Sequence, residues 1–352
     1  MSEFLWIGLG FILVAALIPV ARALAFRCGM TDKPGGRKHH EDETPLVGGL
    51  VIFPVFMAVG VLAGFSIASY WPLYLGIAIL LLTGALDDRY DIGAWARFFV
   101  QIAVASLVVV FGDARLDHLG DLFGFGQFNL GFMAIPFSIV AVTLFVNAVN
   151  LMDGLDGLAA GKGLIALLWL MAACTLTGAW GAFAEIGILA ACLCGFLLYN
   201  MRHPFRDRAA IFLGDAGSLA LGLVLAWYCI GLARDPDPAV VPITIAWIIG
   251  LPVMDACGQF YRRVKEGRHP FSPDRGHFHH HFIHAGIPVK YATPLILGWA
   301  FVMGGVGVLG IALGLPQVIL SLVWTAMLFA HIALSNKPDR FIAFLKMRFG
   351  HQ

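Results

Sequence analysis

Residues 4–26 of the chain read FLWIGLGFILVAALIPVARALAF, an apolar stretch interrupted by one charged side chain, Arg22. A helix needs about 20 predominantly apolar residues to cross the ~30 Å hydrocarbon core of a bilayer. The stretch is too long for the apolar part of a signal peptide, and no basic segment precedes it. We therefore expect a membrane-spanning helix that is retained in the protein.

The remainder of the chain repeats this apolar pattern. Of its 352 residues, 59% are hydrophobic and 13% are charged, whereas average soluble domains have roughly 45–50% and about 25%. The formal net charge of +1 gives no overall field that would attract a nucleic acid. Composition thus predicts an all-α polytopic membrane protein, a single integral-membrane domain over residues 1–352. We expect eleven transmembrane helices, at residues 4–26, 46–65, 69–86, 96–112, 132–150, 163–179, 182–201, 211–233, 239–261, 291–314 and 316–334.

The lysines and arginines predict the orientation of these helices. If successive loops alternate between the two sides, all but two of the 23 basic residues fall on one side, and the exceptions are Arg115 and Arg234. Basic loops stay in the cytoplasm during membrane insertion. The N-terminus is therefore expected outside and the C-terminus inside, with the polar segments described next at the cytoplasmic face.

The first polar segment is Asp87-Asp88-Arg89-Tyr90-Asp91, at the inner end of the third predicted helix. Two adjacent carboxylates at a membrane boundary repel each other and are costly to remove from water. A plain helix stop would need only one charged residue. The pair therefore favours a functional role.

Two further segments follow the fifth predicted helix and begin the eighth. Residues 147–161 read NAVNLMDGLDGLAAG, and spacings of three place Asn147, Asn150 and Asp153 along one helical stripe. The glycines that follow allow the backbone to approach a ligand closely. Residues 212–218 read FLGDAGS, with Asp215 between glycines at a helix N-terminus. Such an aspartate can cap the helix, or it can hold a divalent cation or a phosphate bridged through one.

The fourth segment, residues 272–284, reads SPDRGHFHHHFIH and holds five histidines within eight residues. Clustered histidines can bind zinc or nickel. Here no cysteine is near, and the other segments offer the hard oxygen ligands that Mg²⁺ prefers. The histidines and Arg275 are therefore interpreted as donors to phosphate and sugar oxygens.

Together the segments predict a Mg²⁺-dependent site for phosphoryl transfer at the cytoplasmic membrane boundary. The chain has no G-x-x-x-x-G-K-[ST] loop, which argues against ATP-driven P-loop chemistry. A cation transporter with an Asp and His relay is the alternative from another class. It is disfavoured because the polar residues cluster at helix ends and not in the middle of the membrane.

In this order, the four segments resemble those of the polyprenyl-phosphate N-acetylhexosamine-1-phosphate transferases. The sequence FSPDRGHFHH at residues 271–280 is similar to the branch that transfers N-acetylglucosamine 1-phosphate. The run His279-His280-His281-Phe282 also fits the branch that transfers phospho-N-acetylmuramoyl-pentapeptide, and other UDP-N-acetyl sugars stay open as donors. The resemblance extends to further residues, namely Asp32, Lys33, Pro34, Arg37, Lys38, Pro45, Gly48 and Gly49.

The resemblance implies transfer of N-acetylglucosamine 1-phosphate from its UDP derivative to undecaprenyl phosphate. This is the first membrane step of O-antigen and lipopolysaccharide synthesis in the bacterial inner membrane. It implies Mg²⁺, with Mn²⁺ as a substitute, and a homodimer is possible. Asp215 and Asn150 would hold the metal. The expected catalytic residues are Asp87, Asp88, Asp153, Asp156 and His279, and the expected substrate-binding residues are Asn147, Phe212, Arg275, His277 and His280.

Overall fold

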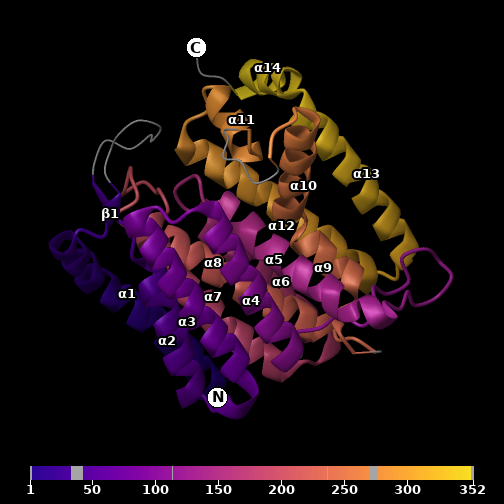
Figure 1. The fold of residues 1–352 in the computed structure, drawn as a ribbon, viewed down its shortest axis with the longest axis horizontal. Helices are drawn as coiled ribbons and strands as arrows, with labels where there is room; N and C mark the ends of the chain where they lie inside the picture. Colours follow the sequence, from indigo (N-terminus) through magenta and orange to yellow (C-terminus); the bar gives the residue numbers. More distant parts are fainter. Residues whose placement is uncertain (1, 33–42, 113, 236, 270–275, 350–352) are drawn as a thin grey trace.

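The computed structural model describes residues 2–32, 43–112, 114–235, 237–269 and 276–349. Helices in these ranges pack into one bundle, and a two-residue antiparallel hairpin, β1 (Thr31–Asp32) with β2 (Thr44–Pro45), lies at one end (Figure 1). The helices are α1 (Ser2–Cys28), α2 (Gly48–Leu62), α3 (Ile67–Tyr90), α4 (Ala94–Phe111), the 3-10 turn η1 (Gly131–Met133), α5 (Ala134–Leu151), α6 (Leu158–Thr177), α7 (Trp180–Asn200), α8 (Gly214–Ala233), α9 (Pro242–Ile248), α10 (Gly250–Lys265), α11 (Phe278–His284), α12 (Val289–Ala312), α13 (Gln317–Asn336) and α14 (Pro338–Phe349).

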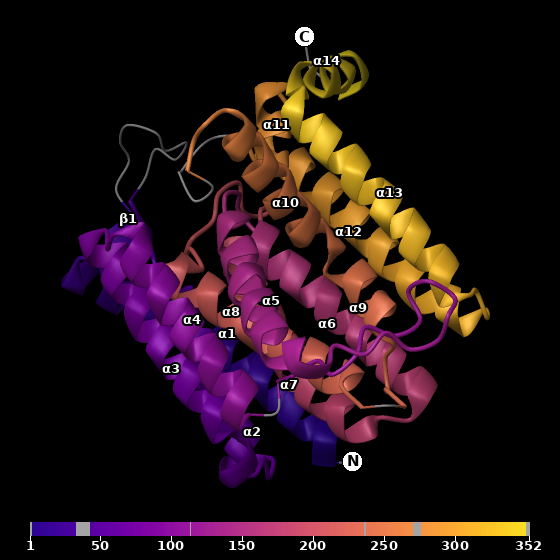
Figure 2. The ribbon, with the colours of Figure 1, turned by 45° about the vertical axis from the view of Figure 1, so that its right-hand side comes forward.

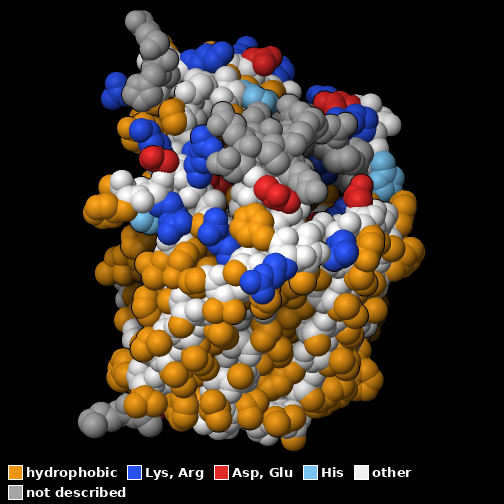
Figure 3. Space-filling view, turned by 90° about the vertical axis from the view of Figure 1, so that its left-hand side faces the viewer, with side chains coloured by type: hydrophobic (Ala, Val, Ile, Leu, Met, Phe, Trp, Pro, Cys, Tyr) orange, Lys and Arg blue, Asp and Glu red, His pale blue; other side chains and the backbone are white. Residues whose placement is uncertain are grey.

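The all-α polytopic membrane architecture predicted from composition is confirmed. Within the described ranges, nine helices are long and apolar enough to cross a membrane, and the bent pair α9–α10 makes a tenth. Helix α2 fills the remaining predicted span, but it has only 15 residues, about 22 Å at 1.5 Å per residue. The number eleven therefore stays a prediction. On the face drawn in Figure 3, hydrophobic side chains cover most of the surface and charged ones gather at one end.

The ninth predicted helix, residues 239–261, is not continuous. Helices α9 and α10 meet at Ile249 with a bend of 75°. Pro252 has no N–H to donate to the carbonyl of Ile248, which removes the hydrogen bond that would carry the helix across this point. The bend separates apolar α9 from α10, which ends with Arg262, Arg263 and Lys265.

Helix α8 forms the centre of the bundle, and nearly all of its residues are buried. Its first turn is approached closely by α2 and α3. A Cβ on Gly49 would lie 2.2 Å from the Cα of Gly217, and a Cβ on Gly84 would lie 2.2 Å from the backbone N of Ala216. Small residues let helix backbones come together in a membrane. These contacts fix where the α8 N-terminus lies relative to α3.

A second hydrophobic cluster joins α9 to α14 and positions the histidine segment. Helix α11 packs beside α12 and α14 at the same end of the molecule as the C-terminus (Figure 2). The ring of Phe278 on α11 stacks on Phe341 of α14 with centroids 5.8 Å apart. The short histidine helix is thus held from the side by the C-terminal helix.

Candidate active site

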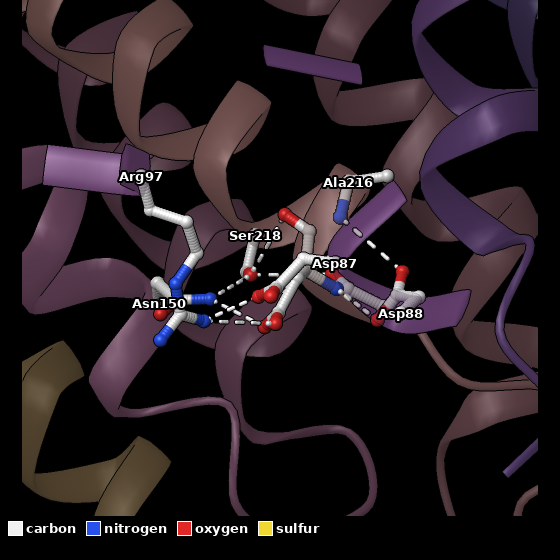
Figure 4. Close-up of polar contacts among 8 residues, drawn as sticks. Asp87, Asp88, Arg97, Asn150, Ala216 and Ser218 are labelled. Carbon is white, nitrogen blue, oxygen red and sulfur yellow. Dashed lines mark hydrogen bonds and ion pairs between the residues drawn. The ribbon is translucent and has the colours of Figure 1, made fainter. Parts of the chain in front are cut away.

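The N-terminus of α8 is held by a carboxylate from α3. Asp88 Oδ1 accepts a hydrogen bond from the backbone N–H of Asp215 at 3.0 Å, and its Oδ2 accepts one from Ala216 at 3.5 Å (Figure 4). The first N–H groups of a helix lack partners within the helix and carry partial positive charge, so a carboxylate is stabilised there. Gly214 has φ of +76°, and a Cβ on it would lie 2.7 Å from Asp88 Oδ2. Glycine at this position lets Asp88 reach the helix.

The side chain of Asp215 is oriented by α5. Asn150 Nδ2 donates to Asp215 Oδ1 at 2.7 Å and to Ser218 Oγ at 2.9 Å (Figure 4). The two residues expected to hold a metal therefore meet, although 65 positions separate them in the sequence.

A basic residue of α4 completes this network. Arg97 forms an ion pair with Asp87, and its Nη1 lies 3.3 Å from Asp215 Oδ2. Asp87 is buried, and its Oδ1 atom has no hydrogen-bond partner among the described residues. Among the basic residues, Arg97 was not expected at the site. Its sequence signal is that it is the single charged residue of the apolar helix α4.

The network reaches into two cavities. The first has a volume of about 350 Å³, and we name it the acidic cavity. Six predicted site residues line it, namely Asp88, Asp153, Asp156, Phe212, Asp215 and His280. The second has a volume of about 480 Å³ and mixes polar with aromatic groups, so we name it the amphipathic cavity. It is lined by Arg97, Asn147, Asn150, Arg263, Trp95 and Phe98, among others.

Two aspartates in the acidic cavity have different surroundings. Asp153 lines the acidic cavity. Partial removal from water by the surrounding protein, together with the negative charges of Asp215, Asp88 and Asp156, raises the pKa of Asp153 to about 8. Asp156 is instead fixed in place. Its Oδ2 accepts hydrogen bonds from Arg202 Nε at 2.7 Å and from the backbone N–H of residue 209 at 3.2 Å.

The histidines of the fourth segment take up different positions. His280 faces the acidic cavity. His279 is buried. Its ring lies directly behind Gly154, which lines the cavity, and a Cβ on Gly154 would lie 2.2 Å from His279 Nε2. Burial, followed by the charge of His280, lowers the pKa of His279 well below its usual value, so its ring is neutral.

His277 reaches neither of these two cavities. Its Nδ1 lies 2.9 Å from Asp255 Oδ2 on α10, and its Nε2 lies 3.3 Å from Arg263. Asp255 also accepts a hydrogen bond from the backbone N–H of Phe278 at 2.9 Å. The contact with His277 and Phe278 fixes the start of α11. Of the other expected residues, Arg275, Lys33, Arg37 and Lys38 lie outside the described residues.

The oxygen atoms of the network suit a hard divalent cation. No three His, Cys, Asp or Glu side chains are arranged to hold a metal ion by themselves within the described ranges. Mg²⁺ usually takes one or two carboxylates together with water and substrate phosphates, so a full protein cage is not required. The carboxylate of Asp215 and the unpartnered Asp87 Oδ1 are donors of this kind. The residues present therefore fit Mg²⁺ bound together with a phosphate ligand.

Known proteins are similar to this chain over most of its length. The family model of glycosyl transferase family 4 matches residues 70–233. An Escherichia coli (strain K12) protein is 34% identical over 310 residues, which cover 85% of this chain and 81% of that protein. Relatives from Yersinia pestis and Haemophilus influenzae are 35% and 32% identical, with 85% and 83% of this chain and 82% of each relative covered. All three are named undecaprenyl-phosphate alpha-N-acetylglucosaminyl 1-phosphate transferase. The resemblance inferred from the motifs is thus confirmed, and the chain belongs to glycosyl transferase family 4, together with these transferases.

Proposed function

We propose that the chain transfers N-acetylglucosamine 1-phosphate from UDP-N-acetylglucosamine to undecaprenyl phosphate. A phosphate oxygen of the lipid attacks the β-phosphorus of the nucleotide sugar. The bond from that phosphorus to the bridging oxygen breaks, and UMP leaves with the electron pair. The observation that carries the proposal is the junction of Asp87, Asp215 and Arg97 between two cavities of different character. It adds to the similarity of the chain to transferases of that name.

The character of the cavities assigns one substrate to each. The acidic cavity offers Asp153, Asp156 and Arg202 to the polar groups of a nucleotide sugar, and Phe212 offers a ring for stacking on uracil. The amphipathic cavity has Trp95 and Phe98 beside cationic Arg97 and Arg263, which suits a phosphate carried on an isoprenoid chain. Asn147 lines the amphipathic cavity, so it is proposed to bind the lipid phosphate and not the nucleotide sugar.

Mg²⁺ would be held by Asp215, with Mn²⁺ as a substitute. Asn150 donates one amide hydrogen to Asp215 and the other to Ser218, so it orients the Asp215 carboxylate and keeps its own Oδ1 as a further oxygen ligand. When bound, the cation would neutralise charge on the pyrophosphate of the donor.

The remaining residues position the two phosphates. Arg97 would bring positive charge to the lipid phosphate, and Asp87 would orient Arg97. Asp88 is engaged with the α8 N–H groups, so its role is to hold Asp215 in place. A strong base is not required, because a phosphate monoester is already largely ionised near pH 7. His280 and Arg275 are proposed to bind phosphate and the N-acetyl sugar, and buried His279 is proposed to position the ring of His280 beside it.

The cellular setting follows from the substrates. UDP-sugars are cytoplasmic, so the network is proposed at the cytoplasmic face of the bacterial inner membrane, with the N-terminus outside. The product would start O-antigen or a related surface polysaccharide. A homodimer stays a prediction.

The test is product identification with purified protein in lipid nanodiscs. Undecaprenyl phosphate and a panel of UDP-sugars are supplied, and the lipid product is identified by mass. We expect only the N-acetylglucosamine phosphate adduct, its loss in EDTA, and its return with Mg²⁺ or Mn²⁺. Asp215→Asn should abolish turnover, whereas Asp339→Asn on the exposed face of α14 should not. An adduct formed only from UDP-N-acetylmuramoyl-pentapeptide, or activity that persists in EDTA, would contradict the proposal.

A further inference from the structure

A third cavity lies at the end of the bundle away from Asp215, and the proposed reaction does not use it. We name it the distal cavity. It has a volume of about 380 Å³, and its lining includes Tyr70, Glu185, Trp227, Tyr228 and Arg234. Tyr228 follows Asp215 by 13 positions on α8, which is about 20 Å along the helix axis. The distal cavity is therefore separate from the transferase site.

Glu185 is an ionisable residue within a candidate membrane span. It lies on α7 five positions after Trp180, about 8 Å from the start of the helix. Its carboxylate forms a hydrogen bond with Tyr70, and within the described ranges no lysine or arginine pairs with it. Carboxylates at membrane depth are costly and are usually paired. Glu185 therefore offers a carboxyl group without a basic partner among the described residues, with which a bound cation could pair.

Aromatic rings form a wall beside this carboxylate. The ring centroid of Tyr70 lies 6.0 Å from that of Tyr74 and 6.0 Å from that of Trp227. A Cβ on Gly112 would lie 2.5 Å from the Trp227 ring, so glycine there leaves room for the indole. Aromatic faces attract organic ammonium groups, whereas a small divalent ion would require several more oxygen ligands. The surroundings of Glu185 thus favour an organic ammonium.

Two buried hydroxyl groups add a requirement for hydrogen-bond donors. The hydroxyl oxygens of Tyr74 and Tyr228 have no partner among the described residues, and both side chains interact electrostatically with Glu185. Buried polar atoms without partners are rare and usually indicate a missing water, ion or ligand. Tyr228 lines the distal cavity, whereas Tyr74 stacks against the ring of Tyr70. A primary ammonium has three N–H donors, enough for the carboxylate and the Tyr228 hydroxyl, whereas a quaternary ammonium has none.

The rim of the cavity adds a charge of the opposite sign. Arg234 lies there, paired with Asp235 at 3.5 Å, and its side chain is 38% exposed. The exposed rings of Trp71 on α3 and Trp180 on α7 lie at this end of the bundle. Tryptophans of this kind mark the headgroup region of a bilayer. A ligand with an ammonium for Glu185 and a phosphate for Arg234 would enter at headgroup depth.

We propose that the distal cavity binds the headgroup of a zwitterionic phospholipid that carries a primary ammonium. The ammonium lies on Glu185, within the ring wall of Tyr70 and Trp227, and the phosphate faces Arg234. Phosphatidylethanolamine has this chemistry, and soluble phosphoethanolamine shares it without the acyl chains. The site is independent of the transferase reaction, and occupancy would tie the far ends of α3, α7 and α8 together.

The test measures lipid retention and thermal stability of the full chain. Protein is reconstituted into nanodiscs of phosphatidylglycerol alone, or with added phosphatidylethanolamine or phosphatidylcholine, and retained lipid is counted by native mass spectrometry. We expect selective retention of phosphatidylethanolamine and a higher Tm with it. Glu185→Gln keeps the shape and removes the charge, so it should weaken retention roughly tenfold or more. Tyr228→Phe should weaken it by a smaller factor.

Glu266→Gln, an exposed change at the other end of the bundle, is the matched control and should behave as the wild type. Transferase activity of Glu185→Gln should remain, which shows that the variant is folded. Equal retention of phosphatidylethanolamine by the wild type and Glu185→Gln would show that the lipid does not bind at Glu185. Equal stabilisation by phosphatidylcholine would show that a primary ammonium is not required. Equal stabilisation by soluble phosphoethanolamine would show that the ligand need not be a lipid.

Discussion

Arg97 shows how one side chain can connect carboxylates from two helices. Its guanidinium, on α4, lies between Asp87 of α3 and Asp215 of α8. Asp87 is almost fully buried, and a buried carboxylate without a partner is strongly destabilising. A planar guanidinium can serve two carboxylates at once, whereas a lysine ammonium is a compact point charge. Arg97 therefore has both a structural and an electrostatic role at the junction of the two cavities.

Replacement of Arg97 separates these two roles. Arg97→Lys should keep the fold but lower kcat by about 100-fold, the usual cost of removing one preorganised electrostatic group. Arg97→Ala should in addition destabilise the protein by about 3 kcal/mol, because Asp87 loses its partner. Lipid-product assays and thermal melts measure these effects, and Arg89→Lys on an exposed side chain is the control. Activity of Arg97→Lys within twofold of wild type would remove Arg97 from the mechanism.

His281 predicts how stability depends on pH. Both ring nitrogens are buried and have no partner among the described residues. The pKa of His281 is lowered to about 4, mainly by burial; Asp255 opposes this shift, and the charges of His331, Arg262 and His284 add to it. The unfolded chain takes up a proton on this residue below about pH 6.5, whereas the folded protein does not. Stability therefore falls as the pH drops from about 6.5 to about 4, and this residue adds no further loss below that.

The size of this effect follows from the shift in pKa. It corresponds to about 3 kcal/mol at full extent, at 1.36 kcal/mol per pKa unit. His281→Leu should flatten the decline in Tm between pH 6.5 and 4.5, while His203→Leu on the exposed loop should leave it as in the wild type. An unchanged slope in His281→Leu would show that this ring is not the titrating group. Activity of His281→Leu near pH 7.5 should stay close to normal, because the residue lines neither active-site cavity.

At the scale of helices, close backbone contacts position the site. The turn before α8 is held through the hydrogen bonds Gly48 N–H to the carbonyl of Phe212 and Gly49 N–H to that of Leu213, both at 3.0 Å. Helix α2 thus lies against the first turn of α8, where Asp215 begins the network. Any side chain larger than hydrogen at Gly49 must push the two helices apart.

A matched pair of glycine substitutions tests this contact. Gly49→Ala should destabilise the protein by about 1–3 kcal/mol through overpacking and should reduce activity by moving Asp215. Gly8→Ala, on α1, meets no atom within 4 Å and should be neutral or stabilise by about 0.5–1 kcal/mol, because alanine favours a helix over glycine. Thermal melts and turnover of both variants give the comparison. Equal effects from the two changes would mean that the α2–α8 approach is not tight.

The helices could be predicted from the sequence where a bilayer requires a long apolar segment. Apolar length placed the third span at residues 69–86, and the structure has α3 at Ile67–Tyr90, because any membrane-crossing segment must satisfy its backbone internally. The break at Ile249 was not predicted, because the surrounding residues are apolar on both sides and hydropathy does not register a lost hydrogen bond.

The site could be predicted where several of its residues lie within one sequence motif. Asn147, Asn150 and Asp153 were expected on one helical stripe; Asn147 and Asn150 line the amphipathic cavity, whereas Asp153, beyond the end of α5, lines the acidic cavity. The pairing of Asp255 with His277 could not be derived, since 22 positions separate them and no local pattern marks their contact. His277 was therefore expected at the substrate, whereas its ring faces Asp255 and Arg263.

At the scale of the whole molecule, the first and last helices bear on the parity of the crossings. The start of α1 and helix α14 lie at opposite ends of the bundle (Figures 1 and 2). A chain that starts at one end and finishes at the other crosses an odd number of times. Counting α2 and the bent pair α9–α10 with the nine longer helices gives the predicted eleven, an odd number. Charged side chains gather at one end on the face drawn in Figure 3, so that end is proposed to be cytoplasmic.

Cysteine labelling tests this orientation with a residue the chain already has. Cys28, at the end of α1 nearest the hairpin, is the exposed cysteine, and the other five are buried or partly buried. A membrane-impermeant maleimide should label Cys28 in inverted membrane vesicles and not in spheroplasts, and Cys28→Ser should remove the signal. In that background Phe125→Cys, at a side chain that is 95% exposed in the loop before α5, should label in spheroplasts only. The reverse pattern would place the carboxylate network outside the cell, where UDP-sugars are absent. Labelling of both positions from the same side would mean an even number of crossings between them.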